Sequence, residues 1–230
     1  MLVTYHIVSD RNSKLHNAAK LSCSFWNKFI VPETPIVIRL SVFTQFGNTI
    51  ARAYEPYFRD GVKYGVVEFN TQFLDRFSQY EIVGTLIHEI GHTLGIGWDR
   101  WMDLFDTNTG KFNQYATETV PDLNQMLVET DYGPGTTLVH WDELSFGKEL
   151  MTGLKNDDEY LLPVTIDVME LLGHNIQEKL TEPQKLADII DNLRGVVFSQ
   201  SDEVTRINRD AYVKTDIWEE IYSHQRSQFS

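Results

Sequence analysis

Two histidines and a glutamate stand close together in the segment His88-Glu89-Ile90-Gly91-His92. Residues four apart lie on one face of an α-helix, so both imidazoles can bind the same metal ion. The glutamate between them can then reach a water molecule on that metal and take its proton. This spacing predicts a metal-dependent hydrolytic site on a helix.

The residues around this segment predict the helix itself. Ser78 and Glu81 have the S-x-x-E spacing of a capping box, which satisfies the free amides of a first helical turn. Gly95 stands where the helix would end, in a left-handed turn that glycine enters at little cost. Apolar residues recur at helical spacing between these signals and predict a buried stripe beside the histidine face: Ile82, Val83, Leu86, Ile87, Ile90 and Leu94.

A catalytic zinc ion usually binds three protein ligands and leaves the fourth position to water, so a third ligand is required. Trp98 follows Gly95 by three residues and cannot bind a metal, whereas its neighbour Asp99 is one candidate. The remaining candidates are the other histidines of the chain: His6, His16, His140, His174 and His224. His6 is expected on a strand, facing solvent or packed on a sheet surface, and His174 is expected to be structural at a helix end.

His140 is distinguished by its neighbours. His140 and Trp141 follow the Gly-Pro-Gly turn 133–135 and precede the segment Glu149-Leu150-Met151-Thr152-Gly153. Together with the H-E-x-x-H-x-x-G pattern at 88–95, this arrangement resembles the leishmanolysin-like branch of the metzincins, a group of zinc peptidases. The resemblance covers roughly residues 2–175 and is most specific at 85–95 and 133–153.

The resemblance implies specific roles for these residues. His88, His92 and His140 would bind Zn²⁺, with residues 93–139 as an insertion between the second and third ligands. Met151 would lie beneath the metal, and Glu89 would be the general base of an endopeptidase. The substrate would be a peptide or protein that adds as a strand to a sheet edge between residues 44 and 70.

The apolar patterns predict an α+β fold. Strands are expected at 2–8, 36–43, 48–54 and 65–70, and helices at 13–30, near 101–105, at 165–172 and at 183–193. The resemblance implies a metzincin-like domain over residues 1–175. Its upper part (1–95) would hold a mixed twisted sheet with a backing helix and the active-site helix, above a smaller, irregular and helical lower part (96–175). Residues 176–230 are expected to form a helical C-terminal appendage, which would pack on the domain or bind a partner protein.

Composition excludes some functions. The 230 residues carry a net charge of −13, with 33 acidic and 20 basic side chains and no Lys/Arg-rich run, which argues against nucleic acid or an anionic membrane as the partner. No stretch reaches the roughly 20 apolar residues of a membrane helix, and the N-terminus lacks the pattern of a signal peptide. The single cysteine, Cys23, is expected in the core. We expect synthesis in the cytoplasm, with a place in a virion or non-classical export left open.

These features leave two classes of function. The first is a zinc-dependent endopeptidase. The alternative is a structural or attachment component of a larger assembly, such as a phage particle, that retains a metzincin fold. The expected lack of a signal peptide and of disulfides favours the alternative, whereas an inert scaffold would have no need of Glu89. Zinc-dependent hydrolysis of another bond is a third hypothesis.

Overall fold

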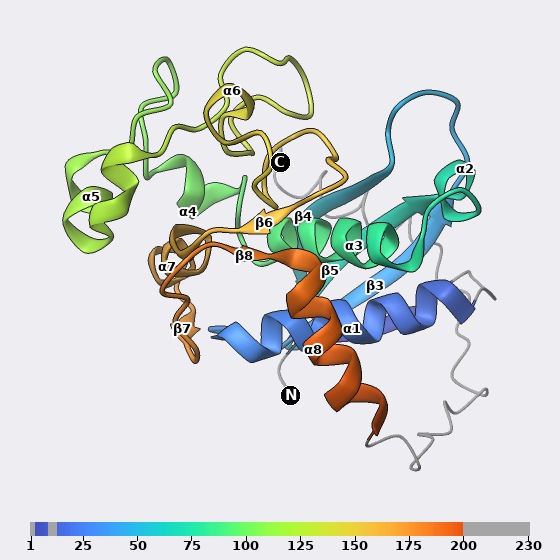
Figure 1. Cartoon of the computed structure of the whole chain (residues 1–230). Helices are drawn as coiled ribbons and strands as arrows, with labels where there is room; N and C mark the ends of the chain where they lie inside the picture. The colour runs from blue at the N-terminus through green and yellow to red at the C-terminus, as the bar shows by residue number, and fades with distance from the viewer. Residues whose placement is uncertain (1–2, 9–12, 200–230) are drawn as a thin grey trace. The chain divides into compact units, whose positions relative to one another are not determined.

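The computed structural model of the chain describes residues 3–8 and 13–199, which form a mixed α+β domain (Figure 1). Its main sheet has four strands in the order β1-β3-β5-β4. The strands are β1 (Val3–Ile7), β3 (Ile36–Phe43), β4 (Ala51–Arg59) and β5 (Val62–Asn70). β1, β3 and β5 run parallel, while β4 is antiparallel to β5 and forms one edge of the sheet.

Strands β4 and β5 are joined by a two-residue hairpin turn. Asp60 and Gly61 both have positive φ, at 51° and 78°, as a type I′ turn requires, and Asp-Gly is a favoured pair for that turn. Both strands are longer than the predicted segments 48–54 and 65–70. In β4 the alternation of side chains is interrupted, because the register of its pairing with β5 shifts between Tyr54 and Tyr57. The full length of β4 could therefore not be predicted from the sequence.

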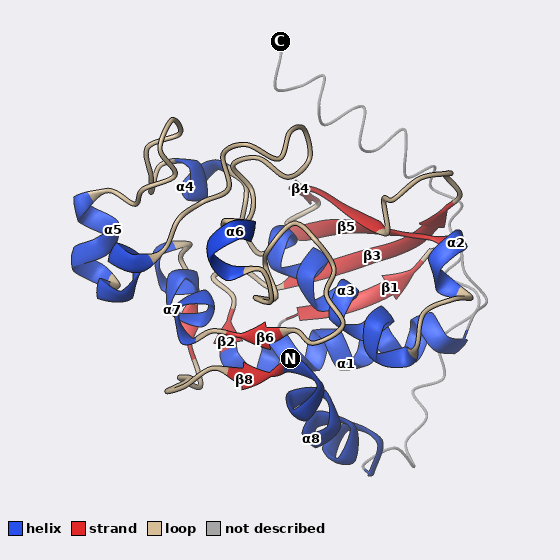
Figure 2. Cartoon of the chain, turned by 45° about the horizontal axis from the view of Figure 1, so that its top comes forward, coloured by secondary structure: helices blue, strands red, loops and turns tan. Residues whose placement is uncertain are grey.

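Two helices, α1 (Ser13–Phe29) and α3 (Gln79–Thr93), pack on the same face of the sheet (Figure 2). Trp26 of α1 donates a hydrogen bond from its indole nitrogen to the carbonyl oxygen of Ile87 at 2.9 Å. α3 also lies very close to β5. A Cβ atom at Gly65 would come within 2.6 Å of the Thr93 Cβ, so the absence of a side chain permits this approach. The helix that carries the histidines is thereby fixed against the sheet.

The part that follows α3 consists of short elements and long connections. They are α4 (Asp99–Met102), α5 (Gln114–Thr119), the 3₁₀ helix η1 (Pro121–Gln125), α6 (Glu143–Phe146) and α7 (Pro163–Leu171). An aromatic cluster of Trp101, Phe105, Phe112 and Trp141 holds them, with ring centroids 5.1–5.9 Å apart. This region is irregular and partly helical, as predicted.

The compact unit extends beyond the expected boundary at residue 175 and ends at Ser199. α8 (Leu186–Ser199) packs against α1 and α3 because its Leu186, Ile189 and Ile190 are buried. Two small sheets also join this region to the domain. They pair β2 (Ile30–Val31) with β7 (Asn175–Ile176), and β6 (Tyr160–Leu161) with β8 (Gln184–Lys185). The remaining helix is α2 (Thr71–Leu74), and residues 200–230 of the expected appendage lie outside the described residues.

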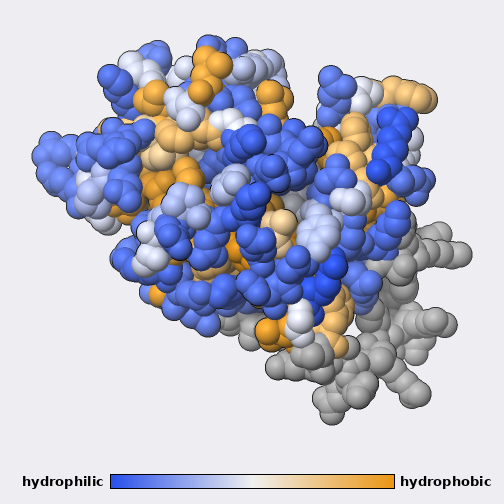
Figure 3. All heavy atoms as spheres, viewed as in Figure 1, coloured by the Kyte–Doolittle hydropathy of each residue, from blue (hydrophilic) through white to orange (hydrophobic). Residues whose placement is uncertain are grey.

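The visible surface of the domain is mainly hydrophilic (Figure 3). Most residues on the face shown in Figure 3 are hydrophilic, with apolar residues visible in smaller patches between them. Among the described residues, no helix is both long enough and apolar enough to cross a membrane.

The contact between α3 and β5 can be tested with a glycine pair. Gly65→Ala should destabilise the domain by about 1–3 kcal/mol, because the buried Thr93 cannot move away from an added methyl group. The matched control is Gly195→Ala on α8, where no atom of the described part of the chain lies within 4 Å of the new Cβ and where alanine favours the helix. Urea denaturation of both variants measures the difference. Equal stability of the two variants would contradict the close packing of α3 on the sheet.

Candidate metal centre

Helix α3 presents the histidines from a well-defined position. Its N-terminus has the predicted capping box, since Ser78 accepts a hydrogen bond from the Glu81 amide and the Glu81 carboxylate accepts one from the Ser78 amide. Its C-terminus is followed by Gly95 with φ of +127°, as predicted. His92 and Glu89 are buried and His88 is half-buried, so the motif lies at the inner end of a cavity and not on an open surface.

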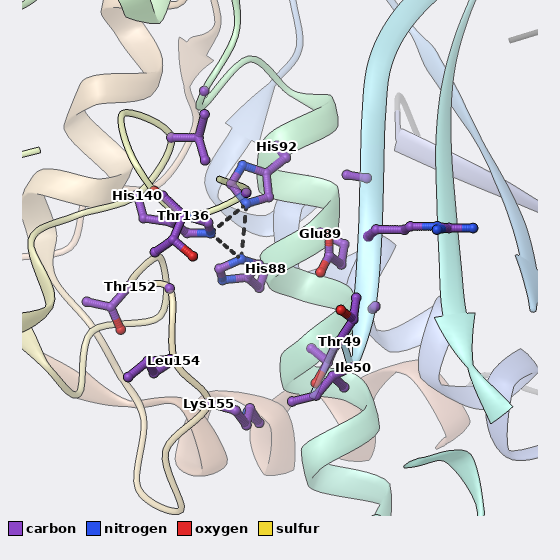
Figure 4. Close-up of a pocket in the computed structure, with 18 of the residues that line it drawn as sticks. Thr49, Ile50, His88, Glu89, His92, Thr136, His140, Thr152, Leu154 and Lys155 are labelled. Atoms are coloured by element: carbon purple, nitrogen blue, oxygen red, sulfur yellow. Dashed lines mark hydrogen bonds between the residues drawn. The ribbon is translucent and has the colours of Figure 1, made fainter. Parts of the chain in front are cut away.

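Three imidazoles meet at one point. The Nε2 atom of His88 lies 3.0 Å from that of His92 and 3.1 Å from that of His140, and the last two are 3.2 Å apart (Figure 4). Among the described residues, this is the one group of three or more His, Cys, Asp or Glu side chains that could hold a metal ion. The structure therefore brings His140 to the two helical histidines across the long insertion.

The other ring nitrogen of each histidine has a backbone partner. The Nδ1 atoms of His88, His92 and His140 lie 2.7, 3.0 and 3.0 Å from the carbonyl oxygens of Leu150, Ile96 and Thr136, respectively. A carbonyl oxygen can only accept, so each Nδ1 carries the proton and each Nε2 presents a lone pair. The three Nε2 atoms cannot hydrogen-bond to one another in this form. They are placed to share a cation.

Electrostatics favours the same neutral form. Burial lowers the pKa of His92 to about 3, and the nearby His140 adds to this effect. Burial also lowers the pKa of His88 and of His140, with the two other imidazoles contributing at His88. Neutral imidazole is the form that binds metals, so the site needs little further deprotonation at neutral pH.

The distances fit a tetrahedral ion. Zinc–nitrogen bonds of about 2.0–2.1 Å at tetrahedral angles place the ligand nitrogens about 3.3 Å apart. The observed separations of 3.0–3.2 Å are close to that value. All three histidines line the cavity, so a cation held between them would be accessible from it.

The other candidates within the described residues do not join this group, and His224 lies outside those residues. Asp99 is exposed in the first turn of α4, and Trp98 lines the cavity without a ligand atom. His174 is buried elsewhere: its Nε2 donates to the carbonyl oxygen of Leu94 at 2.6 Å, and its Nδ1 accepts from the Glu33 amide at 3.1 Å. Its structural role is therefore confirmed. His6 is exposed on β1, in agreement with the strand prediction.

Cys23 is buried in the core on α1, as predicted. Burial raises the pKa of its thiol well above the usual range. A thiol of this kind stays protonated and unreactive at neutral pH.

The segment containing His140 is held by Glu129, which the sequence analysis missed. The Glu129 amide donates to the His140 carbonyl oxygen at 2.9 Å, and the Glu129 carbonyl oxygen accepts from the Leu138 amide at 2.7 Å. Leu138 adopts a positive φ of 68°, which is uncommon for a residue with a side chain. Its carbonyl oxygen accepts a hydrogen bond from the Trp101 indole at 2.8 Å. These bonds keep the strained backbone in place two residues before the metal-binding imidazole.

Met151 lies against the histidine helix. Its sulfur is so close to Gly91 that a Cβ atom there would come within 2.9 Å, and Gly91 lies on α3 between His88 and His92. The Met151 carbonyl oxygen accepts from the Trp141 amide at 3.0 Å, which joins this turn to the residue after His140. The methionine is fully buried.

A buried glutamate, Glu149, organises the same turn; the sequence analysis quoted it within the segment 149–153 but gave it no role. The Glu149 carboxylate accepts hydrogen bonds from the Met151 amide, from the Thr165 hydroxyl at 2.6 Å and from the Leu162 amide at 3.4 Å. Thr165 in turn accepts from the Trp141 indole at 3.0 Å. Burial raises the pKa of Glu149 to about 7, although these donors act in the opposite direction.

The three-histidine group lines a cavity of about 560 Å³. One wall is the segment 48–53, which leads into the edge strand β4, and the opposite wall comes from residues 134–140 and 152–155. Glu89 lines the cavity next to His88 (Figure 4). Burial raises the pKa of Glu89 to about 8, and a cation beside it would favour the carboxylate and lower that pKa.

No known protein family and no curated protein matches this sequence. The fold and the site define the protein as a mixed α+β domain with a three-histidine group that lines a cavity.

The third ligand can be tested directly. His140→Ala should weaken zinc binding by a factor of about a hundred or more, because one of three ligands is lost. Asp99→Ala is the matched control and should leave the affinity unchanged, since Asp99 is exposed and outside the group. Competition with a chromogenic chelator measures both constants. Weakening by Asp99→Ala alone would show that the third ligand has been assigned to the wrong residue.

Proposed function

We propose that this protein is a zinc-dependent endopeptidase with a metzincin-like fold. The observation that carries the proposal is the convergence of three neutral imidazoles at 3.0–3.2 Å with a buried carboxylate beside them. The H-W segment at 140, the supporting Met151 and the irregular part after α3 agree with the family resemblance. Within the described residues, the four-stranded mixed sheet and the two helices on its face also agree with it.

His88, His92 and His140 would hold the zinc ion through their Nε2 atoms. Bound there, zinc acts as a Lewis acid and makes water a nucleophile near neutral pH. Nitrogen ligands in this number and arrangement, with one open position, favour zinc over calcium or magnesium, which prefer oxygen ligands.

Glu89 would move the proton. Its carboxylate lies in the cavity beside His88 and takes the proton of the attacking water, and the acid then passes that proton to the departing amine. Its buried position keeps bulk water from competing for the proton. Because Glu89 lies between His88 and His92 on α3, the helix sets its distance from both histidines.

The substrate would lie along the segment 48–53. This segment borders the cavity and enters β4, one of the two edge strands of the main sheet. An extended peptide could form main-chain hydrogen bonds with such a strand, and its carbonyl groups would then pass the metal centre. β4 lies within the range 44–70 in which the sequence analysis expected the substrate-binding edge, which supports this assignment.

Replacement of Glu89 separates the peptidase hypothesis from that of a structural component. Glu89→Gln keeps the side-chain size, so fold and zinc content should survive while turnover of casein falls by about a hundred- to ten-thousandfold. Glu118→Gln, at an exposed glutamate of α5, is the control and should leave the rate unchanged. Casein hydrolysis with and without chelator gives the rates. Zinc-loaded parent protein that cleaves no peptide would contradict the proposal and favour a structural role.

A further inference from the structure

An ion pair stands at the end of the cavity away from His92. Lys155 and Glu159 form a hydrogen-bonded salt bridge, and both residues line the cavity. Only 17% of the Lys155 side chain and 9% of the Glu159 side chain are exposed. Figure 4 shows Lys155 beyond Leu154 and Ile50, at the opposite end of the pocket from His92.

The pair is seated on the metal-binding helix. A Cβ atom at Gly84 would come within 3.1 Å of the Lys155 Nζ and within 3.0 Å of a Glu159 carboxylate oxygen. Gly84 lies on α3 one turn before His88, so the distance between the charged pair and the metal centre is set by the helix. Glu159 is held further by its backbone, since its carbonyl oxygen accepts from the Leu186 amide at 2.9 Å.

A buried charged pair adds little to the stability of the fold, so its presence beside the cavity suggests a role in binding. Removing both charges from water has a desolvation cost, and apolar residues of similar size would be as stable or more so. An apolar substrate side chain at this end would cover the pair and remove its remaining water without replacing it. A side chain that offers a charge or hydrogen bonds of its own would replace that water.

Lys155 is the member that a ligand can reach more easily. It is the more exposed of the two. Its ammonium group has three N–H donors, and among the described residues its hydrogen-bond partner is Glu159. Glu159 is more buried and fixed at its backbone. A cationic ligand would approach Lys155 and the metal centre with like charge, whereas an anionic ligand would be attracted to both.

Resting on the proposed peptidase function, we propose that this end of the cavity is a subsite for an acidic substrate side chain next to the scissile bond. Lys155 binds the carboxylate of that side chain. Glu159 orients the ammonium and, by its own negative charge, limits the strength of the interaction. The enzyme therefore prefers Glu or Asp at this position over Leu or Lys.

The test uses zinc-loaded full-length protein and two variants with opposite expected effects. Peptides that differ only in Glu, Gln, Leu or Lys beside one cleaved bond are compared by kcat/KM, after mapping that bond in unfolded casein by mass spectrometry. The Glu peptide should exceed the Gln peptide by about tenfold, the usual worth of a hydrogen-bonded charge. Lys155→Met should reduce the ratio of kcat/KM for the Glu peptide to that for the Gln peptide to about one, whereas Glu159→Gln should increase the ratio.

Lys185→Met is the control for Lys155, because Lys185 forms a more exposed pair with Asp158 and does not line the cavity. It should leave the Glu/Gln ratio unchanged. Loss of packing alone would not move the ratio in opposite directions in Lys155→Met and Glu159→Gln. Cleavage without a preference for Glu, or a ratio unchanged in Lys155→Met, overturns the subsite and leaves the peptidase function intact.

A binding measurement keeps the subsite testable without turnover. The same four peptides are titrated into zinc-loaded Glu89→Gln protein, and the Glu peptide should bind about tenfold more tightly than the Leu peptide. Equal affinity for the two peptides overturns the subsite. Absence of hydrolysis by the parent protein, together with the expected order of binding, would instead contradict the peptidase function alone.

Discussion

The site depends on one physical constraint: three imidazole lone pairs point at a common position. Each ring carries its proton on Nδ1 and donates a hydrogen bond from it to a backbone carbonyl oxygen. No ring therefore has a proton on Nε2 to donate to its neighbours. Three acceptors at 3.0–3.2 Å repel one another unless a cation lies between them. The backbone partners thus determine both the tautomers and the directions of the rings, and the surrounding fold must keep those partners in place.

The fold meets this requirement through close backbone approaches at glycines. Gly65 lets α3 lie on β5, and Gly91 lets the Met151 sulfur lie on α3. Gly97 has the same function for the segment before His140, since a Cβ atom there would come within 2.8 Å of the Val139 Cβ. The imidazoles therefore rest on packed backbone rather than on flexible loops. The cavity, by contrast, is bordered by the charged groups that we assign to substrate selection.

Elements with a strong local signal could be predicted from the sequence. The bounds of β3 coincide with the predicted 36–43, and α3 begins and ends near its capping box and Gly95, because alternation, periodicity and caps are local properties. The two-stranded β2–β7 and β6–β8 pairs could not be predicted, since two-residue strands have no periodicity and depend on distant partners. The roles of Glu129 and Glu149 could not be predicted for the same reason. Glu129 belongs to no local pattern, and Glu149 belongs to the segment 149–153, but the role of each comes from hydrogen bonds to the segments around His140 and Met151.

His140 itself shows the limit of residue spacing. Spacing alone identified two ligands and left Asp99 and several histidines as candidates, and only the resemblance favoured His140. X-ray absorption at the zinc edge, on protein purified without added metal and shown by elemental analysis to carry about one zinc per chain, tests the three-histidine centre most directly. We expect three imidazole nitrogens and one further light ligand at about 2.0–2.1 Å from the zinc ion. In His140→Ala the number of imidazole ligands should fall from three to two. Protein that holds no zinc and takes up none on titration, or a zinc shell with fewer than three imidazoles, would contradict it.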